Sequence, residues 1–288
     1  MTEATRVNIG LLGFGEAGKL LGAEFARAPA ASVRAYDILF ESPAFFSECA
    51  TGAASAGVKA MAHLDAFCSG CDVVISVVTA DQAAPAAAAA ARYLRVGQIF
   101  LDFNSVAPDT KRSAAAFVEA AGAAYVDCAV MANVPGRGLA VPILAGGKAA
   151  RRAADLLNPM GMKIDVVSDE IGRASATKLC RSIVIKGMEA LMIDFSEAAD
   201  KCGVFEDVVQ SLDATFPSLD FAALAATMRG RVEQHGIRRA AEMREAAKML
   251  DGFGLGGDLS RAIADVHERV AQERLAKRAR TDTLVANG

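Results

Sequence analysis

Three glycines with a regular spacing follow the first apolar run of the chain. Residues 7–18 read VNIGLLGFGEAG, in which Gly13, Gly15 and Gly18 form the pattern G-x-G-x-x-G. In this pattern the first glycine permits a tight turn, the second lets a pyrophosphate approach backbone N–H groups, and the third lets a helix pack closely on a sheet. The phosphates then lie at the positive end of the helix dipole. The spacing predicts a dinucleotide site, with a purely structural turn as the alternative.

An acidic residue stands where this pattern places a ribose ligand. Asp37 ends the next strand-like run, SVRAYD. Its carboxylate can accept hydrogen bonds from both ribose hydroxyls, and its charge would repel a 2′-phosphate. Arg34 falls on the opposite face of the same strand and is not placed to bind such a phosphate. We expect NAD as the cofactor, with NADP as the second choice, at these residues: Gly13, Phe14, Gly15, Glu16, Ala17, Gly18, Asp37, Val78, Thr79 and Asn104.

The first half of the chain alternates strand-like and helix-like runs. Strands are expected at 7–13, 32–37, 57–60, 72–78, 98–103, 124–130, 141–146 and 163–168. This β-α-β order predicts an α/β fold, a doubly wound and mostly parallel Rossmann-type sheet with helices on both faces.

The pattern becomes wholly helical after residue 168. Helices are expected at 172–200, 204–215, 218–229, 230–251 and 257–278, followed by a frayed tail at 279–288. We therefore expect two domains, a dinucleotide-binding domain at 1–168 and an all-helical substrate and dimerisation domain at 169–288.

Composition and charge exclude several classes of protein. The 288 residues are 53% hydrophobic and 23% charged, so a disordered chain is not expected. The net charge of −3 gives no support to nucleic-acid binding. Neither a signal peptide nor a membrane span is expected, which predicts a cytoplasmic protein.

Six cysteines are scattered along the chain, and one pair has the spacing C-x-x-C. Cys68 and Cys71 come at the end of an expected helix, whereas redox pairs lie at a helix start, where the dipole lowers the thiol pKa. A second such pair, needed for a zinc site, is missing from the sequence. We expect ordinary reduced cysteines and no bound metal.

A nicotinamide enzyme that oxidises an alcohol needs an acid/base side chain near the reacting oxygen. Histidine is the usual choice, but the sequence has only His63, His235 and His267. His63 comes closest to the end of a strand of the first domain, but it stands at the start of a surface-like helix. Asn104 and Ser105 do end a strand at the edge where ligands bind in such folds, and Val78 and Thr79 end the preceding strand. Asn104 and Ser105 are expected to contact the nicotinamide or the substrate, and Val78 and Thr79 to line the passage from the adenosine ribose to the nicotinamide. Loop capping is the alternative for each of them.

Four stretches of the chain resemble the motifs of one enzyme family. They are GLLGFGEAG (10–18), LDFNSVAP (101–108), YVDCAVMANVPGRG (125–138) and GRASATKLCRS (172–182). The second, third and fourth are similar to D-x-S-T-x-x-P, D-A-P-V-S-G-G and G-x-G-x-x-x-K-x-x-x-N of the β-hydroxyacid dehydrogenases, which include 3-hydroxyisobutyrate dehydrogenase and 6-phosphogluconate dehydrogenase. The chain looks most like the 6-phosphogluconate-dehydrogenase-like branch that has its own type of C-terminal domain.

The resemblance implies that Lys178, the lysine of the fourth motif, is the general acid/base. A lysine in water has a pKa of about 10.4, which an apolar cleft or a neighbouring cation lowers. Without the resemblance, a solvent-facing lysine on a long helix is the alternative. Helical spacing places Lys178 near the same face as Ser175, Arg181, Ser182 and Lys186, and these cations predict an anionic substrate.

Two motifs depart from the family pattern. Ser182 replaces the asparagine of the fourth motif, and Met131-Ala132-Asn133 replaces the S-G-G that holds the substrate carboxylate in the family. The substrate is therefore expected to differ from those of the best-known members. We expect it to be bound by these residues: Ser105, Met131, Ala132, Asn133, Arg181, Ser182, His235 and Arg239.

His235, Arg239 and Glu242 recur at helical spacing near the C-terminal part of the chain. In the family a Lys-Asp pair on the corresponding helix closes the site, and this trio could replace it or form a surface salt-bridge ladder. Taken together, the resemblance implies hydride transfer between NAD and a small 3-hydroxy-acid-like substrate in a homodimer. A decarboxylating dehydrogenase, an imine reductase and a non-catalytic NAD-binding regulator remain the alternatives.

Overall fold

The structure, a computed structural model, describes residues 7–28 and 31–286. The chain divides into two compact units, residues 1–178 and 179–288. The sequence analysis placed the boundary at residue 168. In the structure the first turns of the helix that follows, as far as Lys178, group with the sheet. The candidate acid/base lysine therefore belongs to the same unit as the glycine motif.

The first unit is built on an eight-stranded sheet with the order β3-β2-β1-β4-β5-β6-β7-β8. The strands are β1 Val7–Leu12, β2 Ala31–Tyr36, β3 Lys59–Ala60, β4 Val73–Ser76, β5 Ile99–Asp102, β6 Ala124–Val130, β7 Pro142–Gly146 and β8 Lys163–Ser168. β1 to β6 run parallel, β7 is antiparallel to β6, and β8 is parallel to β7. The strand order reverses beside β1, so the predicted doubly wound, mostly parallel sheet is confirmed.

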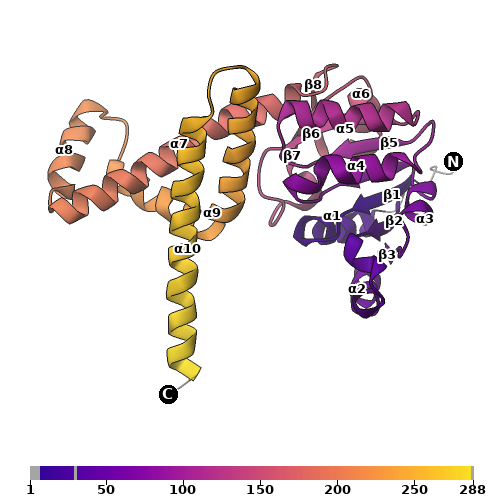
Figure 1. Cartoon of the computed structure of the whole chain (residues 1–288), viewed down its shortest axis with the longest axis horizontal. Helices are drawn as coiled ribbons and strands as arrows, with labels where there is room; N and C mark the ends of the chain where they lie inside the picture. The colour runs from indigo at the N-terminus through magenta and orange to yellow at the C-terminus, as the bar shows by residue number, and fades with distance from the viewer. Residues whose placement is uncertain (1–6, 29–30, 287–288) are drawn as a thin grey trace. The chain divides into compact units, whose positions relative to one another are not determined.

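Helices cover both faces of this sheet, with α4 and α5 in front of the strands in Figure 1. They are α1 Glu16–Arg27, α2 Pro43–Ser55, α3 Leu64–Ser69, α4 Ala83–Ala91, α5 Pro108–Ala120 and α6 Ala150–Leu157, with short 3-10 turns η1 Ile38–Glu41, η2 Ala80–Gln82, η3 Gly138–Ala140 and η4 Asn158–Met160. The sequence analysis assigned no element to residues 38–56, where the structure has η1 and α2. Pro43 opens α2, a position that suits proline because its missing N–H would have no partner there.

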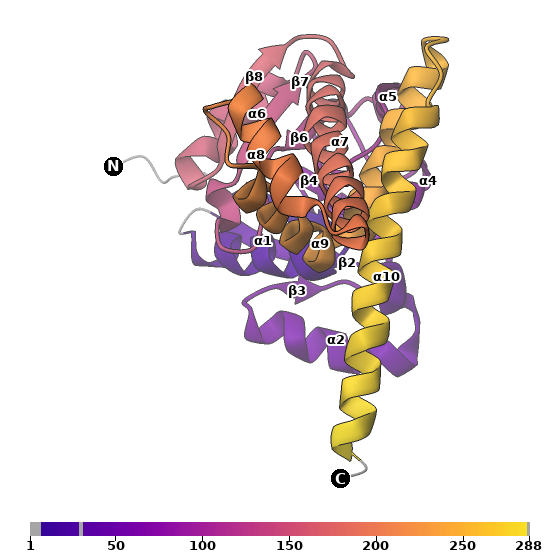
Figure 2. The ribbon, with the colours of Figure 1, turned by 90° about the vertical axis from the view of Figure 1, so that its left-hand side faces the viewer.

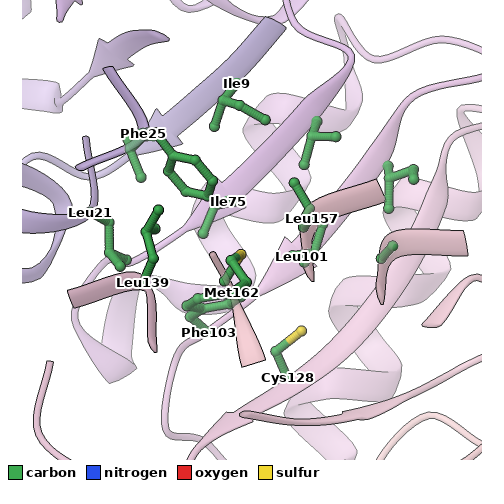
Figure 3. Close-up of a cluster of buried hydrophobic side chains, with 14 of the residues drawn as sticks. Ile9, Leu21, Phe25, Ile75, Leu101, Phe103, Cys128, Leu139, Leu157 and Met162 are labelled. Atoms are coloured by element: carbon green, nitrogen blue, oxygen red, sulfur yellow. The ribbon is translucent and has the colours of Figure 1, made fainter. Parts of the chain in front are cut away.

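Side chains of the strands alternate between the two faces and form two apolar cores. In one core, Ile9, Ile75 and Leu101 of the sheet pack against Phe25 of α1 and Leu157 of α6 (Figure 3). The other core holds these side chains from the opposite face and its helices: Leu12, Val74, Phe100, Phe67, Ala87, Ala114 and Val118. Burial on both faces explains why the strands read as almost continuous apolar runs.

The second unit consists of helices. These are the rest of α7 Arg173–Cys202, then α8 Phe205–Thr215, α9 Phe221–Gly252 and α10 Asp258–Ala286. α9 and α10 run alongside each other (Figures 1 and 2). A Cβ on Gly236 of α9 would overlap the carbonyl oxygen of His267 on α10, so this close approach requires a glycine.

Two helical predictions in the second unit are wrong. The expected helices 218–229 and 230–251 form the single helix α9, because a glycine such as Gly230 costs a helix only about 1 kcal/mol relative to alanine and keeps its backbone N–H for the helical hydrogen bond. The expected frayed tail from 279 is helical as far as Ala286. Residues 258–286 contain neither glycine nor proline, and alanine, leucine, lysine and arginine favour a helix. Residues 287–288 of the expected tail lie outside the described residues.

Candidate cofactor and catalytic site

The glycine motif forms the connection between β1 and α1. Gly13 has a φ of +99°, and a Cβ there would lie 2.8 Å from the Val77 carbonyl oxygen. A Cβ on Gly18 would overlap the carbonyl oxygen of Gly13. At Gly15, the N-cap of α1, no atom of the described residues beyond its chain neighbours lies within 4 Å of a Cβ position, and none of their side chains caps the helix. Two glycines are thus required by the fold, whereas the third leaves open space at a helix N-terminus that suits an anionic phosphate.

The carboxylate of Asp37 lies beside this loop. One of its oxygens accepts a hydrogen bond from the backbone N–H of Phe14 at 2.8 Å, and the other accepts from Leu39 N–H at 3.1 Å. The acceptor at the end of β2 is therefore fixed next to the glycine motif. Arg34 lies away from it, with its guanidinium against Gly70 at the end of α3.

The end of β4 supplies one wall of the glycine loop. Val78 is half-buried, and its side chain lies 3.0 Å from the Cβ position of Gly13. Thr79 is exposed and starts η2, where its hydroxyl hydrogen-bonds the Asp81 carboxylate and lowers the pKa of that group. Glu16 is exposed in the first turn of α1, and Ala17 beside it is half-buried.

The loop after β5 presents two buried polar atoms without protein partners. Asn104 donates its backbone N–H to Asp102 at 2.8 Å and its side-chain amide to Ser76 Oγ at 2.9 Å. Among the described residues, neither Asn104 Oδ1 nor Ser105 Oγ has a hydrogen-bond partner. Both lie at the carboxyl edge of the parallel strands, where ligands bind in such sheets. An amide donor such as the nicotinamide carboxamide suits the Asn104 oxygen, so the residues present fit the dinucleotide.

A fully buried charged network lies behind this loop. Lys111 of α5 forms ion pairs with Asp102 Oδ1 at 3.0 Å and Asp127 Oδ1 at 3.6 Å, and none of these three side chains is exposed. Its ammonium also donates to the carbonyl oxygen of Asp102 at 2.6 Å. Tyr125 donates its hydroxyl to Asp102 Oδ2 at 2.6 Å, and burial together with this carboxylate raises the Tyr125 pKa far above its ordinary value. The phenol therefore stays protonated as a donor.

The sequence analysis did not single out this network. The available signal was the position of Lys111 on the apolar face of α5, in helical spacing with Ala114, Ala115 and Val118. A lysine on an apolar helix face is unfavourable unless its ammonium group pairs with an acidic side chain. The sequence did not show its partners, because they come from strands β5 and β6.

Asp127 also holds the start of α7. Its Oδ2 accepts from Gly172 N–H at 3.0 Å, from Ser175 N–H at 3.1 Å and from Ser175 Oγ at 3.2 Å. Lys178 is half-buried and follows Ser175 by about one turn. The first turn of α7 also lies against α5, because a Cβ on Gly172 would be 3.1 Å from Pro108. The candidate acid/base helix is thus anchored next to the segment that follows Asn104.

The third motif forms the loop between β6 and β7. Met131 is half-buried and donates its N–H to the Pro142 carbonyl at 2.9 Å, Ala132 packs against the core, and Asn133 is exposed. Further along, Leu139 N–H donates to Glu24 of α1 at 2.7 Å. The loop is therefore tied to the helix that follows the glycine motif.

The remaining site residues predicted from the sequence lie in the second unit. Arg181 is exposed, and Ser182 is buried and accepts a hydrogen bond from Lys186 Nζ at 3.1 Å. Lys186 pairs with Glu242 at 2.7 Å, which offsets its charge. Arg239 donates its Nε–H to the buried Glu189 at 2.9 Å. Of the two alternatives for this trio, the surface ladder is wrong for Arg239 and Glu242, because both pair across to α7. His235 is half-buried on α9.

The cysteine pair is inert. Cys68 and Cys71 are free thiols, and burial raises the pKa of each to about 12. His63 is the exposed N-cap of α3. In the part of the chain that the structure describes, no group of three or more histidine, cysteine or acidic residues is arranged to hold a metal. No described helix is both long and apolar enough to cross a membrane.

Comparisons with known proteins bear on both halves of the chain. Residues 8–168 match the NAD binding domain of 6-phosphogluconate dehydrogenase, and residues 199–270 match a domain of unknown function, DUF1932. A conserved hypothetical protein from Sinorhizobium meliloti is 37% identical, with a TM-score of 0.81 over 93% of this chain and 88% of that one. A conserved protein of unknown function, described as structurally similar to 3-hydroxyacid dehydrogenases, is 32% identical, with a TM-score of 0.73 over 93% of this chain and 98% of its own.

More distant similarities agree with this fold. The 3-hydroxyisobutyrate dehydrogenase of Mycobacterium tuberculosis, in a structure with L-serine, has a TM-score of 0.74 at 22% identity over 94% of this chain and 95% of that one. An uncharacterised 28.5 kDa protein of Methanothermus fervidus is 27% identical over 159 residues, which is 55% of this chain and 60% of that protein. The chain therefore belongs to the β-hydroxyacid dehydrogenase family, as the motifs had suggested, and its first unit is an NAD(P)-binding domain of the 6-phosphogluconate dehydrogenase type.

Proposed function

We propose that the protein is an NAD-dependent oxidoreductase with Lys178 as its acid/base. It transfers a hydride between C4 of the nicotinamide and the carbinol carbon of a small, anionic, 3-hydroxy-acid-like substrate. The observation that carries this proposal is the anchoring of α7 by Asp127. It ties the helix that bears Lys178 to β6, at the sheet edge where the nucleotide is expected to bind.

The bound dinucleotide supplies the hydride acceptor or donor. The chain's own residues supply binding, orientation and proton transfer. The open space at Gly15 and the uncapped first turn of α1 bind the phosphates, and Asp37 accepts from the ribose. Asn104 Oδ1, which has no hydrogen-bond partner among the described residues, would accept a hydrogen bond from the carboxamide of the nicotinamide. Lys178 takes the hydroxyl proton during alcohol oxidation and returns it during carbonyl reduction.

The anionic character of the substrate is supported by the charges on α7. Lys186 is paired with Glu242, which leaves Arg181 as the exposed cation of the predicted face to meet a carboxylate. The hydroxyl of Ser182 accepts from Lys186, so its own proton remains free to donate to a substrate oxygen. We propose further substrate contacts from Ser105, Met131, Ala132 and Asn133, and from His235 and Arg239 on α9.

We also propose that the protein is a cytoplasmic homodimer. Val184, Met188 and Leu191 are exposed on α7 at helical spacing, which is unusual for large apolar side chains on a monomer. A second copy of the chain that covers this stripe through the helical unit accounts for their exposure. Small-molecule substrates are the other partners that we propose, and neither nucleic acid nor a membrane is among them.

The assigned role of Lys178 is tested by incubating the protein with NAD and a panel of hydroxy acids. The rate of NADH formation is measured for each hydroxy acid. Lys178→Ala is expected to lower turnover by about 10²–10⁴-fold, the usual contribution of general acid–base catalysis. Its affinity for NADH should stay within about twofold of wild type. Lys201→Ala is the matched control, because Lys201 is an exposed lysine in the last turn of the same helix. Turnover retained by Lys178→Ala would refute the assignment.

A further inference from the structure

We infer that Lys111, Asp102 and Asp127 are positioning residues that hold Asn104 and Lys178 in one fixed arrangement. The inference rests on the proposed function and extends it to residues that do not contact the ligands themselves. These three side chains lie behind the loop and the helix that would meet the ligands. It concerns only the first unit of the chain, to which all five residues belong.

The network is costly to bury, which argues that it does more than fill space. Lys111 and both carboxylates have no exposed surface. Apolar side chains of similar volume usually stabilise a core as well as a buried ion pair does, or better. The ammonium contacts Asp102 Oδ1 at 3.0 Å and attracts Asp127 Oδ1, which lies 3.6 Å away and has no hydrogen-bond partner among the described residues. Both carboxylates are therefore drawn toward the same nitrogen atom, one by contact and the other by charge alone.

One arm of the network controls Asn104. Asp102 Oδ1, which pairs with Lys111, also accepts the backbone N–H of Asn104 at 2.8 Å. Tyr125 holds the other oxygen of the same carboxylate at 2.6 Å. With its backbone fixed in this way, Asn104 donates to Ser76 Oγ and leaves its Oδ1 without a partner among the described residues. A displacement of Asp102 therefore moves the amide that is proposed to meet the cofactor.

The other arm controls Lys178. Asp127 directs Oδ1 toward Lys111 and Oδ2 toward three donors of Gly172 and Ser175. N–H groups in the first turn of a helix have no acceptor within the helix, so a carboxylate supplied by a strand caps them. This cap fixes the first turn of α7, which belongs to the first unit, against β6. Lys178, about one turn further on, takes its direction from that cap.

The two arms predict separable effects of substitution. Asp102→Asn is expected to raise the Kd for NADH about tenfold, because its first effect is on Asn104. Asp127→Asn is expected to lower kcat about tenfold to hundredfold with the Kd for NADH within about twofold, since a small displacement of a catalytic group has an effect of this size. Lys111→Met is expected to change both quantities, because it releases both carboxylates.

Hydrogen–deuterium exchange provides a readout that does not depend on turnover. Asp127→Asn should accelerate exchange in residues 172–180, whereas Asp102→Asn should leave that segment unchanged. Asp72→Asn is the matched control: Asp72 also accepts a backbone N–H, that of Asn8 at 2.8 Å, but at the amino ends of β1 and β4. It should change neither Kd, nor kcat, nor exchange in residues 172–180.

The double variant Lys111→Met/Asp127→Asn separates positioning from stability. It removes one positive and one negative charge, so its melting temperature should recover relative to Lys111→Met alone. Its kcat should stay low, because the cap on α7 remains weakened. Recovery of kcat in parallel with stability would overturn the inference, as would unchanged exchange at 172–180 in Asp127→Asn. Failure of the Lys178 assignment would instead appear as turnover in Lys178→Ala, whatever the exchange data show.

Discussion

Substitution of Gly15 by alanine separates cofactor binding from folding. Gly15 has φ −73° and ψ −157°, which alanine adopts without strain, and its Cβ position has no neighbour within 4 Å. The loss of chain entropy in the unfolded state stabilises such a variant by about 0.4–1 kcal/mol. The poorer N-cap propensity of alanine offsets this by a similar amount. We therefore expect the free energy of unfolding to change by less than about 1 kcal/mol.

Cofactor binding by the same variant should fall sharply. The new methyl group occupies the space in which a phosphate must approach the backbone N–H groups of α1. A hydrogen bond to a charged group contributes about 1.5–3 kcal/mol, so the loss of one raises the Kd for NADH about 10-fold to 150-fold. Fluorescence titration with NADH measures this change, and thermal unfolding without ligand shows that the fold is intact.

Gly13→Ala and Gly18→Ala provide the contrast. Gly13 has a left-handed backbone, which costs alanine about 1–2 kcal/mol, and its Cβ would lie 2.8 Å from the Val77 carbonyl oxygen. A Cβ on Gly18 would overlap the Gly13 carbonyl oxygen. Both variants should therefore melt at lower temperature than wild type, unlike Gly15→Ala. Wild-type affinity for NADH in folded Gly15→Ala would show that the phosphates do not bind at this loop.

Three further predictions concern charge, acid stability and assembly. Asp37→Asn removes the negative charge beside the Phe14 N–H, so we expect the preference for NADH over NADPH to fall about tenfold, a change of 1.4 kcal/mol in relative binding. An unchanged preference in competitive titrations would contradict the role of this carboxylate. Burial, aided by the cations of Arg239 and Lys186, lowers the pKa of His267 to about 4, with the carboxylates of Glu189 and Glu242 also nearby. The unfolded chain then binds the proton more tightly, so the stability present above pH 6.5 should decrease by up to about 3 kcal/mol as the pH falls to 4. Denaturant titrations across this range measure the decrease, and His267→Gln should flatten it. Leu191→Glu should convert the proposed dimer to a monomer in light scattering, whereas Val96→Glu, on an exposed side chain of the first unit, should leave its mass unchanged.

Local spacing was sufficient to predict the nucleotide-binding half. Gly13, Gly15 and Gly18 act within one turn of the chain, and the apolar runs that became β1, β4, β5 and β6 are buried on both faces of the sheet. Each of these signals depends on neighbours in sequence, so a single sequence displays it. The same is true of the resemblance in residues 172–182, where several motif positions fall together on one helix.

Features that depend on tertiary partners could not be predicted in the same way. Lysine is usually a surface residue, so the sequence alone does not indicate that Lys111 is buried. Its burial depends on Asp102 and Asp127, which the strands bring next to it. The spacing of Arg239 likewise left open a surface ladder on its own helix, whereas its partner Glu189 lies on α7. The expected boundary between helices 218–229 and 230–251 falls at Gly230, although a helix tolerates a glycine at a modest cost when packing on both sides continues.

The differing accessibility of the cysteines has a practical consequence. The Cys68, Cys71 and Cys128 thiols are buried, whereas Cys180 and Cys202 are exposed on α7. An alkylating dye applied to the native protein should therefore modify these two exposed thiols and spare the buried ones. Cys180 stands between Lys178 and Ser182 in the sequence, so once Cys202→Ser and Cys49→Ser remove the other exposed thiol and the half-buried one, a single fluorophore reports ligand arrival at this helix in real time. No new attachment point has to be engineered.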